Sequence, residues 1–282
     1  DTHNNLFTLE SNGTLKTAVT FDYESNASTY AIRVEVMDEY NASAEGNFTV
    51  VVTNVNDAPL IVQGDGPLPY YPFEDTNFTV DLNATDVDGD VLSWSIVSDP
   101  SHGVASVVSG TGEVLYTPNS NYEGNDSIIV IVSDGYLTDS LELSLDLTGV
   151  NDLPSITGGA EPLSLSVAED SSLSYDLNHT DPDGYDTASW SLSSGASSGT
   201  ASMDAATGVL SYVPNADFTG SDRVTVLLTD GGGLTDSLEV VLTVNPVNDA
   251  PVIVQGDGPL PYFPFEDTNF TVDLNATDVD GD

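Results

Sequence analysis

The chain has 282 residues, and its 46 Asp and Glu residues against three Lys and Arg residues give a formal net charge of −43 at pH 7. Binding to nucleic acid or to anionic lipid requires a basic surface, so we expect no nucleic-acid partner and no membrane contact within this segment. The chain has no cysteine, which excludes disulfides, zinc–thiolate sites and cysteine nucleophiles. Its longest apolar runs, such as residues 128–132, are far shorter than the ~20 residues that span a bilayer.

The sequence repeats itself at two spacings. Residues 58–90 and 250–282 are identical at 31 of 33 positions, with an offset of 192 residues. A weaker repeat has half this spacing, since the linker-like motif VNDAP or VNDLP begins at Val55, Val150 and Val247. A repeat of this period indicates an array of similar domains. We infer a unit of about 96 residues in two alternating versions, type A and type B.

These repeats divide the chain into four segments. We assign residues 1–57 to the C-terminal part of one domain, residues 58–152 to a type A domain and residues 153–249 to a type B domain. Residues 250–282 are then the N-terminal part of a further type A domain. We expect the segment to be a stretch of a longer array.

The first element of the type A domain is unusual because residues 64–73 contain three prolines. Proline cannot donate a hydrogen bond within a sheet, so this segment is predicted at a sheet edge or in polyproline II geometry. We expect Phe73 to fill the domain core. Tyr70 and Tyr71 are candidates for either the core or a lateral contact in an assembled fibre.

The following elements are predicted strands. Residues 78–82, 127–132 and 140–145 alternate polar and apolar side chains, which is typical of a half-buried strand. Gly, Asp, Asn and Ser clusters separate such stretches, and no segment sustains a helical period. About seven short strands in each unit of about 96 residues predict an all-β chain of tandem Greek-key, Ig-like β-sandwich domains arranged end to end.

The recurring acidic residues are predicted to lie at the ends of these domains. In an up-and-down sandwich, the loops around Glu74, Asp86 and Asp134 and the linkers all fall at one end or the other. Several carboxylates within one junction repel each other unless they are protonated or bridged by cations, and calcium is the hard cation that takes many carboxylate and carbonyl oxygens. Ordinary solvated loop acids are the alternative interpretation, but the recurrence of the whole set favours calcium, with two or three ions per junction. Our candidate ligands derived from the repeat are Glu74, Asn151, Asp152, Glu169, Asp181, Asp183, Asp230, Asn248, Asp249, Asp278 and Asp280.

The motifs in this chain also resemble those of a known family. FDYES at residues 21–25, VEVMDEYN at 34–41 and TNVNDAP at 53–59 are similar to the closing half of a cadherin repeat. The next two units resemble the cadherin-like tandem repeats of giant extracellular surface proteins. This resemblance rests on the turn at residues 100–103, the stretches that end at Asn119 and Asn215, and GNDS at 124–127. The resemblance implies calcium ions held between successive domains. By position it adds the ligands Asp22, Glu24, Asn56, Asp57, Asp86, Asp88 and Asp134.

The second and third units depart from the family pattern because they lack a clear Asp-X-Glu motif. Glu123, Asp126, Asp217 and Asp222 are therefore open alternatives as ligands.

Ten Asn-X-Ser/Thr sequons suggest a glycosylated surface protein, with polar composition as the alternative explanation. Two sequons, at Asn125 and Asn178, lie beside expected metal loops and are the poorest candidates. The eight that we expect to carry glycans are Asn12, Asn26, Asn41, Asn47, Asn77, Asn83, Asn269 and Asn275.

We interpret the chain as a structural, calcium-rigidified segment of a large extracellular glycoprotein that forms a fibre, appendage or stalk at the cell surface. Its expected partners are neighbouring repeats of the same chain, with lateral homo-assembly into a fibre. The alternative is an adhesive module for calcium-dependent binding between cells or to a surface. We expect no enzyme, because His3, His102 and His179 show no spacing that suggests a catalytic triad.

Overall fold

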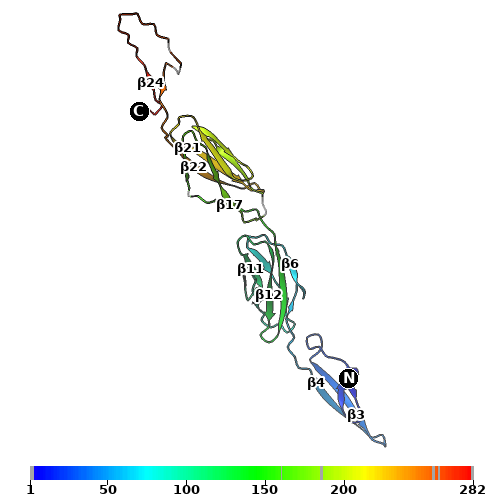
Figure 1. Ribbon diagram of the computed structural model, residues 1–282. Coiled ribbons are helices and arrows are strands. Elements are labelled where there is room, and N and C mark those ends of the chain that lie inside the picture. Colours follow the sequence, from blue (N-terminus) through cyan, green and yellow to red (C-terminus); the bar gives the residue numbers. More distant parts are fainter. Residues whose placement is uncertain (1–2, 160, 185–186, 256–257, 260, 281–282) are drawn as a thin grey trace. The chain divides into compact units, whose positions relative to one another are not determined.

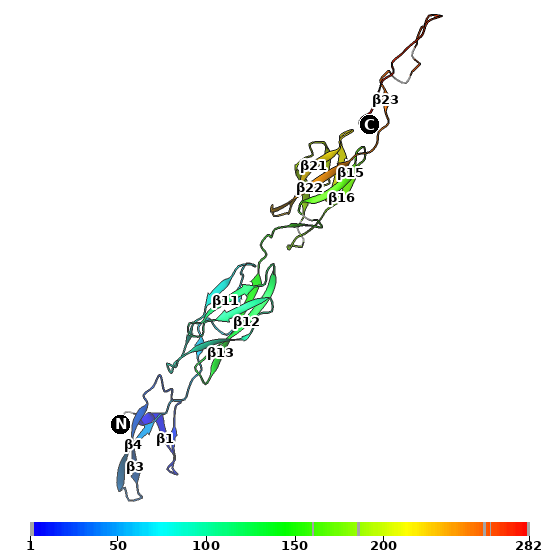
Figure 2. The same ribbon diagram turned by 90° about the vertical axis from the view of Figure 1, so that its left-hand side faces the viewer.

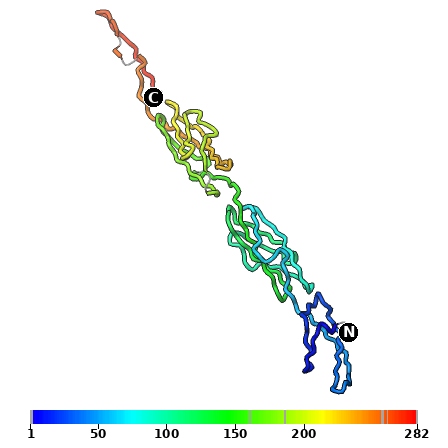
Figure 3. Tube along the Cα trace, turned by 90° about the vertical axis from the view of Figure 1, so that its right-hand side faces the viewer, coloured from blue at the N-terminus to red at the C-terminus, as the bar shows by residue number. Residues whose placement is uncertain are grey.

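A computed structural model describes residues 3–159, 161–184, 187–255, 258–259 and 261–280 (Figures 1 to 3). The chain forms two compact units, Asp1–Val150 and Asn151–Asp282. All of its regular elements are strands, apart from the short 3₁₀ helix η1 (Asn4–Leu6). Among the described residues, no helix is long and apolar enough to cross a membrane.

The first unit begins with two antiparallel hairpins. Strand β1 (Phe7–Leu9) pairs with β2 (Leu15–Thr17), and β3 (Thr29–Met37) pairs with β4 (Ser43–Val51). Two residues of β3, Tyr30 and Ile32, are the buried apolar side chains here. Tyr30 lies 4.6 Å from Phe21, measured between ring centroids.

The rest of the first unit is a two-sheet sandwich, which we call sandwich A (residues 60–147). One sheet has the order β6-β13-β12-β9, and the other has the order β10-β11-β7 (Figure 2). A short antiparallel pair, β5 with β8, accompanies them. The strand bounds are β5 (Leu60–Ile61), β6 (Leu68–Tyr70), β7 (Phe78–Asp81), β8 (Ala84–Thr85), β9 (Ser93–Ser98), β10 (Gly103–Val107), β11 (Glu113–Pro118), β12 (Gly124–Ser133) and β13 (Thr138–Leu147).

The second unit contains sandwich B (residues 155–245), with the same plan. Its sheets have the orders β15-β22-β21-β18 and β16-β20-β19, and β14 pairs with β17. The short pair β23–β24 follows. The strand bounds are β14 (Ser155–Thr157), β15 (Leu163–Ala168), β16 (Leu173–Asp176), β17 (Asn178–Thr180), β18 (Ser189–Ser194), β19 (Gly199–Met203), β20 (Val209–Pro214), β21 (Gly220–Thr229), β22 (Thr235–Asn245), β23 (Val252–Ile253) and β24 (Ala276–Thr277).

Each sandwich has its own core, built from the inward residues of alternating strands. In β12, every second residue from Asp126 to Val132 is buried, and the intervening residues are partly exposed. Trp94 in sandwich A and Trp190 in sandwich B lie in equivalent places in the two cores. Gly112 adopts φ +77°, and a Cβ there would lie 2.6 Å from the Leu82 carbonyl oxygen, so glycine is required for this turn to cover Trp94. The prediction of an all-β chain of tandem sandwiches is confirmed.

The proline-rich segment forms the edge of its sheet. Strand β6 pairs in parallel with β13 alone, and Pro69 is at the centre of this short strand. Tyr70 is half-buried against the core, whereas Tyr71 is exposed. The prediction that Phe73 fills the core is wrong: Phe73 is 57% exposed, because burial alternates along residues 70–74 and places Phe73 on the outward face with Tyr71. The backbone of Phe73 forms an isolated bridge to Thr148.

Candidate metal centres at the linkers

A pair of aspartates anchors the linker in the same way three times along the chain. The backbone N–H of the linker aspartate donates to the second aspartate of the following Asp-X-Asp loop. The nitrogen–oxygen distances are 2.8 Å for Asp57 to Asp88, 2.8 Å for Asp152 to Asp183 and 2.6 Å for Asp249 to Asp280. Each pair lies within one compact unit. The three pairs, which occupy repeated positions in the sequence, also have the same local geometry.

The first aspartate of each Asp-X-Asp loop holds the loop closed. One oxygen of Asp86 accepts the N–H of Asp88 at 2.9 Å, and the same bond forms in the other two loops, at 3.0 Å from Asp183 to Asp181 and 2.9 Å from Asp280 to Asp278. Short side-chain to backbone bonds of this kind stabilise turns. They use one carboxylate oxygen and leave the other for a different partner.

A second loop joins the site in both sandwiches. The side-chain amide of Asn56 donates to Asp134 at 2.7 Å, and that of Asn151 donates to Asp230 at 3.0 Å. Both aspartates directly follow a long central strand, β12 or β21. The hydrogen bond from Asn56, which favours the charged form, is the main cause that lowers the pKa of Asp134. These contacts bring residues about 80 positions apart in sequence to one place.

A buried glutamate marks the opposite end of each sandwich. Glu74 is 3% exposed and accepts the backbone N–H of Val150 at 2.8 Å, and Glu169 is 2% exposed and accepts that of Val247 at 2.6 Å. In each case the donor directly precedes the linker Asn–Asp pair. A carboxylate buried this deeply is costly unless hydrogen bonds or cations compensate for its charge.

At the first linker, Glu24 approaches the Asp-X-Asp loop of sandwich A. Desolvation, followed by the charges of Asp88 and Asp57, raises the pKa of Glu24. Asp22 instead accepts hydrogen bonds within its own turn, chiefly from the Ser25 backbone, and its pKa is lowered. A cavity of about 360 Å³ adjoins both residues and reaches Asp57.

At the third linker, acidic side chains gather around Asp249. Single oxygens of Glu169, Asp249 and Asp280 lie within 4.8 Å of one another, and so do single oxygens of Asp170, Asp217 and Asp249. Desolvation, followed by the neighbouring carboxylates, raises the pKa of Asp249. Like charges held this closely are mutually destabilising without a cation.

The donor set fits calcium. One oxygen each of Asp86, Asp181 and Asp249 is buried and has no hydrogen-bond partner within the described structure. The three basic side chains of the sequence pair elsewhere: Lys16 with Glu10, Arg33 with Glu45, and Arg223 with Glu239. Carboxylate oxygens that lack both hydrogens and cationic partners are the ligands that a hard divalent ion takes.

Asp126 and Asp222, two of the four residues left open as metal ligands, have a different role. Asp126 accepts hydrogen bonds on both of its oxygens, from the backbone N–H groups of Ser101 and His102 and from the hydroxyl of Tyr116. Asp222 does the same in sandwich B with Ser197, Ser198 and Tyr212. Their oxygens therefore hold a loop inside the sandwich and are not free for an ion.

Three residues near these sites were not among the predicted ligands. Asn54 donates to Asp88 at 2.6 Å, Asp90 lies with Asp86 and Asp88 in one acidic group, and Asp170 lies beside Asp249. For Asp170 the repeat offered a signal, because an aspartate directly follows the repeated glutamate at Asp75, Asp170 and Asp267. All three adopt a positive φ in the structure. All eight expected glycan carriers are exposed.

Family models match both sandwiches. Residues 56–145 match the bacterial Ig domain, and residues 151–246 match the bacterial cadherin-like domain. The resemblance to cadherin-like tandem repeats is thus confirmed, with an Ig-type model for the first of the two sandwiches. A comparison with curated proteins gave no match.

Solved structures share the fold. Mouse cadherin-23 extracellular domains 22–24 align with 87% of this chain and 84% of theirs, at 19% identity and a TM-score of 0.58. Protocadherin γB2 domains 3–6 align with 90% of this chain, at 19% identity and a TM-score of 0.55. This chain spans 66% of that structure and 52% of a second γB2 structure that covers domains 1–5. At such identities the likeness shows the fold alone, a tandem array of cadherin-like sandwiches.

Proposed function

We propose that this chain is a structural repeat segment of an extracellular glycoprotein, in which calcium ions bound at the linkers limit bending between domains. The observation that carries the proposal is the buried, unpartnered oxygen of the Asp-X-Asp loop at Asp86 and at its equivalent Asp181. The loop and its linker are already tied together by hydrogen bonds, so the oxygens are preorganised for a cation.

Each linker supplies ligands of the same kinds. At the first linker we assign Asp57, Asp86, Asp88 and Asp134 with Glu24, and at the third linker Glu169, Asp249, Asp278 and Asp280. A bound ion supplies positive charge that cancels the repulsion among these carboxylates. Because the ligands come from both sides of the linker, a bound ion that cancels their repulsion favours one relative orientation of the two joined domains over many. Calcium at the millimolar concentrations outside cells suits the weak affinities of extracellular modules.

A calcium titration of the whole chain, followed by calorimetry, tests this proposal. Calcium that binds only the folded state adds about 2.7 kcal/mol of stability per site at a concentration of 100 Kd, so the melting temperature should rise by several degrees. Asp249→Asn removes the ligand with the unpartnered oxygen at the third linker and should lower the number of ions bound. Asp65→Asn, an exposed acid away from the linkers, is the matched control and should leave that number unchanged.

An equal rise in melting temperature with sodium chloride at matched ionic strength would instead mean that general screening acts on a solvated acidic surface. In that case the linkers hold no specific ion, and the proposed stiffening fails.

Glycosylation at the eight predicted sequons belongs to the same proposal, and their exposure in the fold supports it. Glycans on a chain with this charge agree with a location outside the cell. Unshifted masses for all eight sequon peptides from the native source would remove this part of the proposal.

A further inference from the structure

Two exposed ion pairs of this chain occupy the same position in two different domains. Arg33 of β3 lies opposite Asn47 of β4 and pairs with Glu45, two residues earlier on β4. Arg223 of β21 lies opposite Val241 of β22 and pairs with Glu239, again two residues earlier. The last two long strands of a domain therefore present an arginine and a glutamate on a fixed diagonal.

Sandwich A keeps the glutamate and lacks the arginine. By register, Ser127 of β12 lies opposite Ser144 of β13, and Glu142 is two residues before Ser144. Ser127 thus takes the position of Arg223, and Glu142 takes that of Glu239. No hydrogen bond or ion pair joins the Glu142 carboxylate to another described residue, so its charge faces solvent without the guanidinium that its counterparts have.

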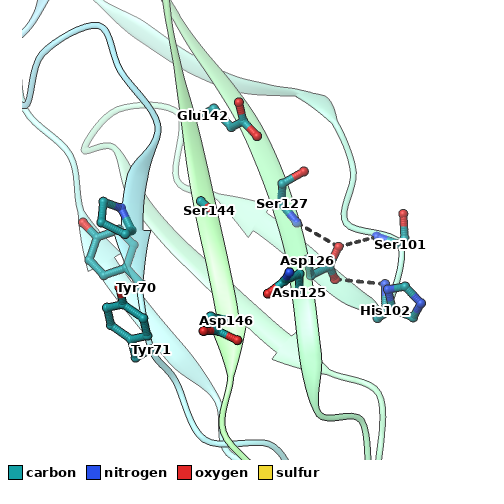
Figure 4. A pocket seen from close by; sticks show the side chains of 11 residues that line it. Tyr70, Tyr71, Ser101, His102, Asn125, Asp126, Ser127, Glu142, Ser144 and Asp146 are labelled. Carbon is teal, nitrogen blue, oxygen red and sulfur yellow. Dashed lines mark hydrogen bonds between the residues drawn. The ribbon is translucent and has the colours of Figure 1, made fainter.

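A cleft lies over the face on which sandwich A lacks this arginine. A cavity of about 480 Å³ lies over this face, with Glu142, Ser144 and Asp146 along β13 and Ser127 beside them on β12. Figure 4 shows Tyr70 of the edge strand β6 and Tyr71 directly after it, across from Asp146, with Glu142 farther along β13. Tyr71 is 69% exposed, so its ring is available to a ligand. In sandwich B, Ser166 and Thr243 stand at the register positions of Tyr71 and Asp146.

We propose that this cleft binds an arginine side chain on a basic segment of another protein. A guanidinium fits the acids and the ring of this lining, because its planar fork pairs with a carboxylate, as Arg223 does with Glu239, and its face stacks on an aromatic ring such as that of Tyr71. The repeat of this segment at residues 250–282 has Phe263 in place of Tyr71, which keeps the ring and loses the hydroxyl. The ring therefore carries the contact. A second copy of this chain is a poor occupant, because its arginines are both paired and its net charge is −43.

The test uses the isotope-labelled whole chain, in calcium, titrated with the capped peptide Gly-Ser-Gly-Arg-Gly-Ser-Gly and observed by NMR. The amide signals of Ser127, Glu142 and Ser144 should shift in a saturable way. The same peptide with citrulline in place of arginine keeps the shape and loses the charge. Its affinity should be about tenfold lower, as expected when a charge-assisted contact and a cation–π contact are lost.

Ser127→Arg is the most informative variant because it gives sandwich A the arginine that sandwich B already tolerates. The new side chain should pair with Glu142, leave the melting temperature unchanged and abolish peptide binding. Glu142→Gln should weaken binding about tenfold. Glu113→Gln changes an exposed acid on β11, in the opposite sheet, and should bind like the natural chain.

Equal affinity for the arginine and citrulline peptides, or unchanged binding by Ser127→Arg, would overturn the proposal. So would the absence of saturable shifts with the arginine peptide. Shifts produced by a neutral oligosaccharide and not by the peptide would assign the cleft to carbohydrate instead and also overturn it.

Discussion

Carboxylates with buried oxygens fall into two groups in this protein, according to the number of hydrogens directed at them. Asp222 receives backbone N–H groups and a tyrosine hydroxyl, so its negative charge is compensated inside sandwich B. The corresponding Asp126 is compensated in the same way in sandwich A. Asp86 and Asp249 each keep one buried oxygen without a donor. The charge of the first pair is satisfied within its own domain, and the second pair has the unpartnered oxygens to which we assign a cation.

Asp222 should stabilise sandwich B above pH 4 and not below pH 2. Burial alone would raise its pKa, but hydrogen bonds from Ser197, Ser198 and Arg223 lower it from 3.8 to about 2. Because the folded pKa lies below the unfolded value, the stabilisation is full above pH 3.8 and is lost as the pH falls toward 2. It amounts to up to about 2 kcal/mol.

Urea unfolding, in the presence of chelator, measures the difference in stability between Asp222→Asn and its parent. Both proteins carry Trp94→Phe, so that the fluorescence of Trp190 alone reports the unfolding. The variant should be about 2 kcal/mol less stable at pH 7 and nearly equal to its parent at pH 2. Asp176→Asn, an exposed acid on β16, is the matched control. A gap that stays constant between these two pH values would contradict the assigned role.

The sequence was enough to choose the recurring acids that the structure brings together at the linkers, but not all of their neighbours. Asp88, Asp134 and Asp230 recur at fixed spacings at loop ends, so a repeat argument was enough to choose them. Asn54 does not recur, and only its contact with Asp88 reveals it. Asp126 and Asp222 also recur, and only their hydrogen bonds separate them from the ion ligands, because a spacing does not show which direction a carboxylate faces.

At the scale of elements, the end of the edge strand β6 places two successive tyrosines in different environments. Tyr70 lies against the core with its ring centroid 5.0 Å from that of Phe78, and burial raises its pKa. Tyr71 follows the strand and is exposed. The three prolines predicted the edge position, because they cannot complete a ladder on both sides. They did not predict that Phe73 points outward: burial keeps alternating beyond the strand, so that Pro72 and Glu74 take the buried positions and Phe73 takes the exposed one.

Replacing the two tyrosines should therefore have opposite consequences. Tyr70→Ala removes a half-buried aromatic ring and should destabilise sandwich A by about 2 kcal/mol. Tyr71→Ala should change its stability by less than about 0.5 kcal/mol. Urea unfolding followed by Trp94 fluorescence, with Trp190→Phe in both proteins, gives both values. Equal losses for the two variants would mean that Tyr71 belongs to the core.

At the scale of the whole molecule, the repeat gives each linker the same hydrogen-bonded geometry. The same backbone bond joins linker and loop at Asp57, Asp152 and Asp249, and each sandwich places its acids at its ends. Within each sandwich the core is complete and independent. The proposed ions at the linkers are therefore expected to act on the relation between domains more than on the fold of any one of them.

The most direct test measures the distance between two domains with and without calcium. The chain has no cysteine, so Thr49→Cys on β4 and Ser95→Cys on β9 place spin labels only on the two sides of the first linker. Pulsed electron resonance should give a distance distribution that is broad in chelator and narrow in millimolar calcium. Adding Asp86→Asn and Asp88→Asn should keep it broad in both conditions. A distribution that calcium leaves unchanged, or that sodium chloride narrows equally, would contradict calcium-dependent stiffening of the linkers.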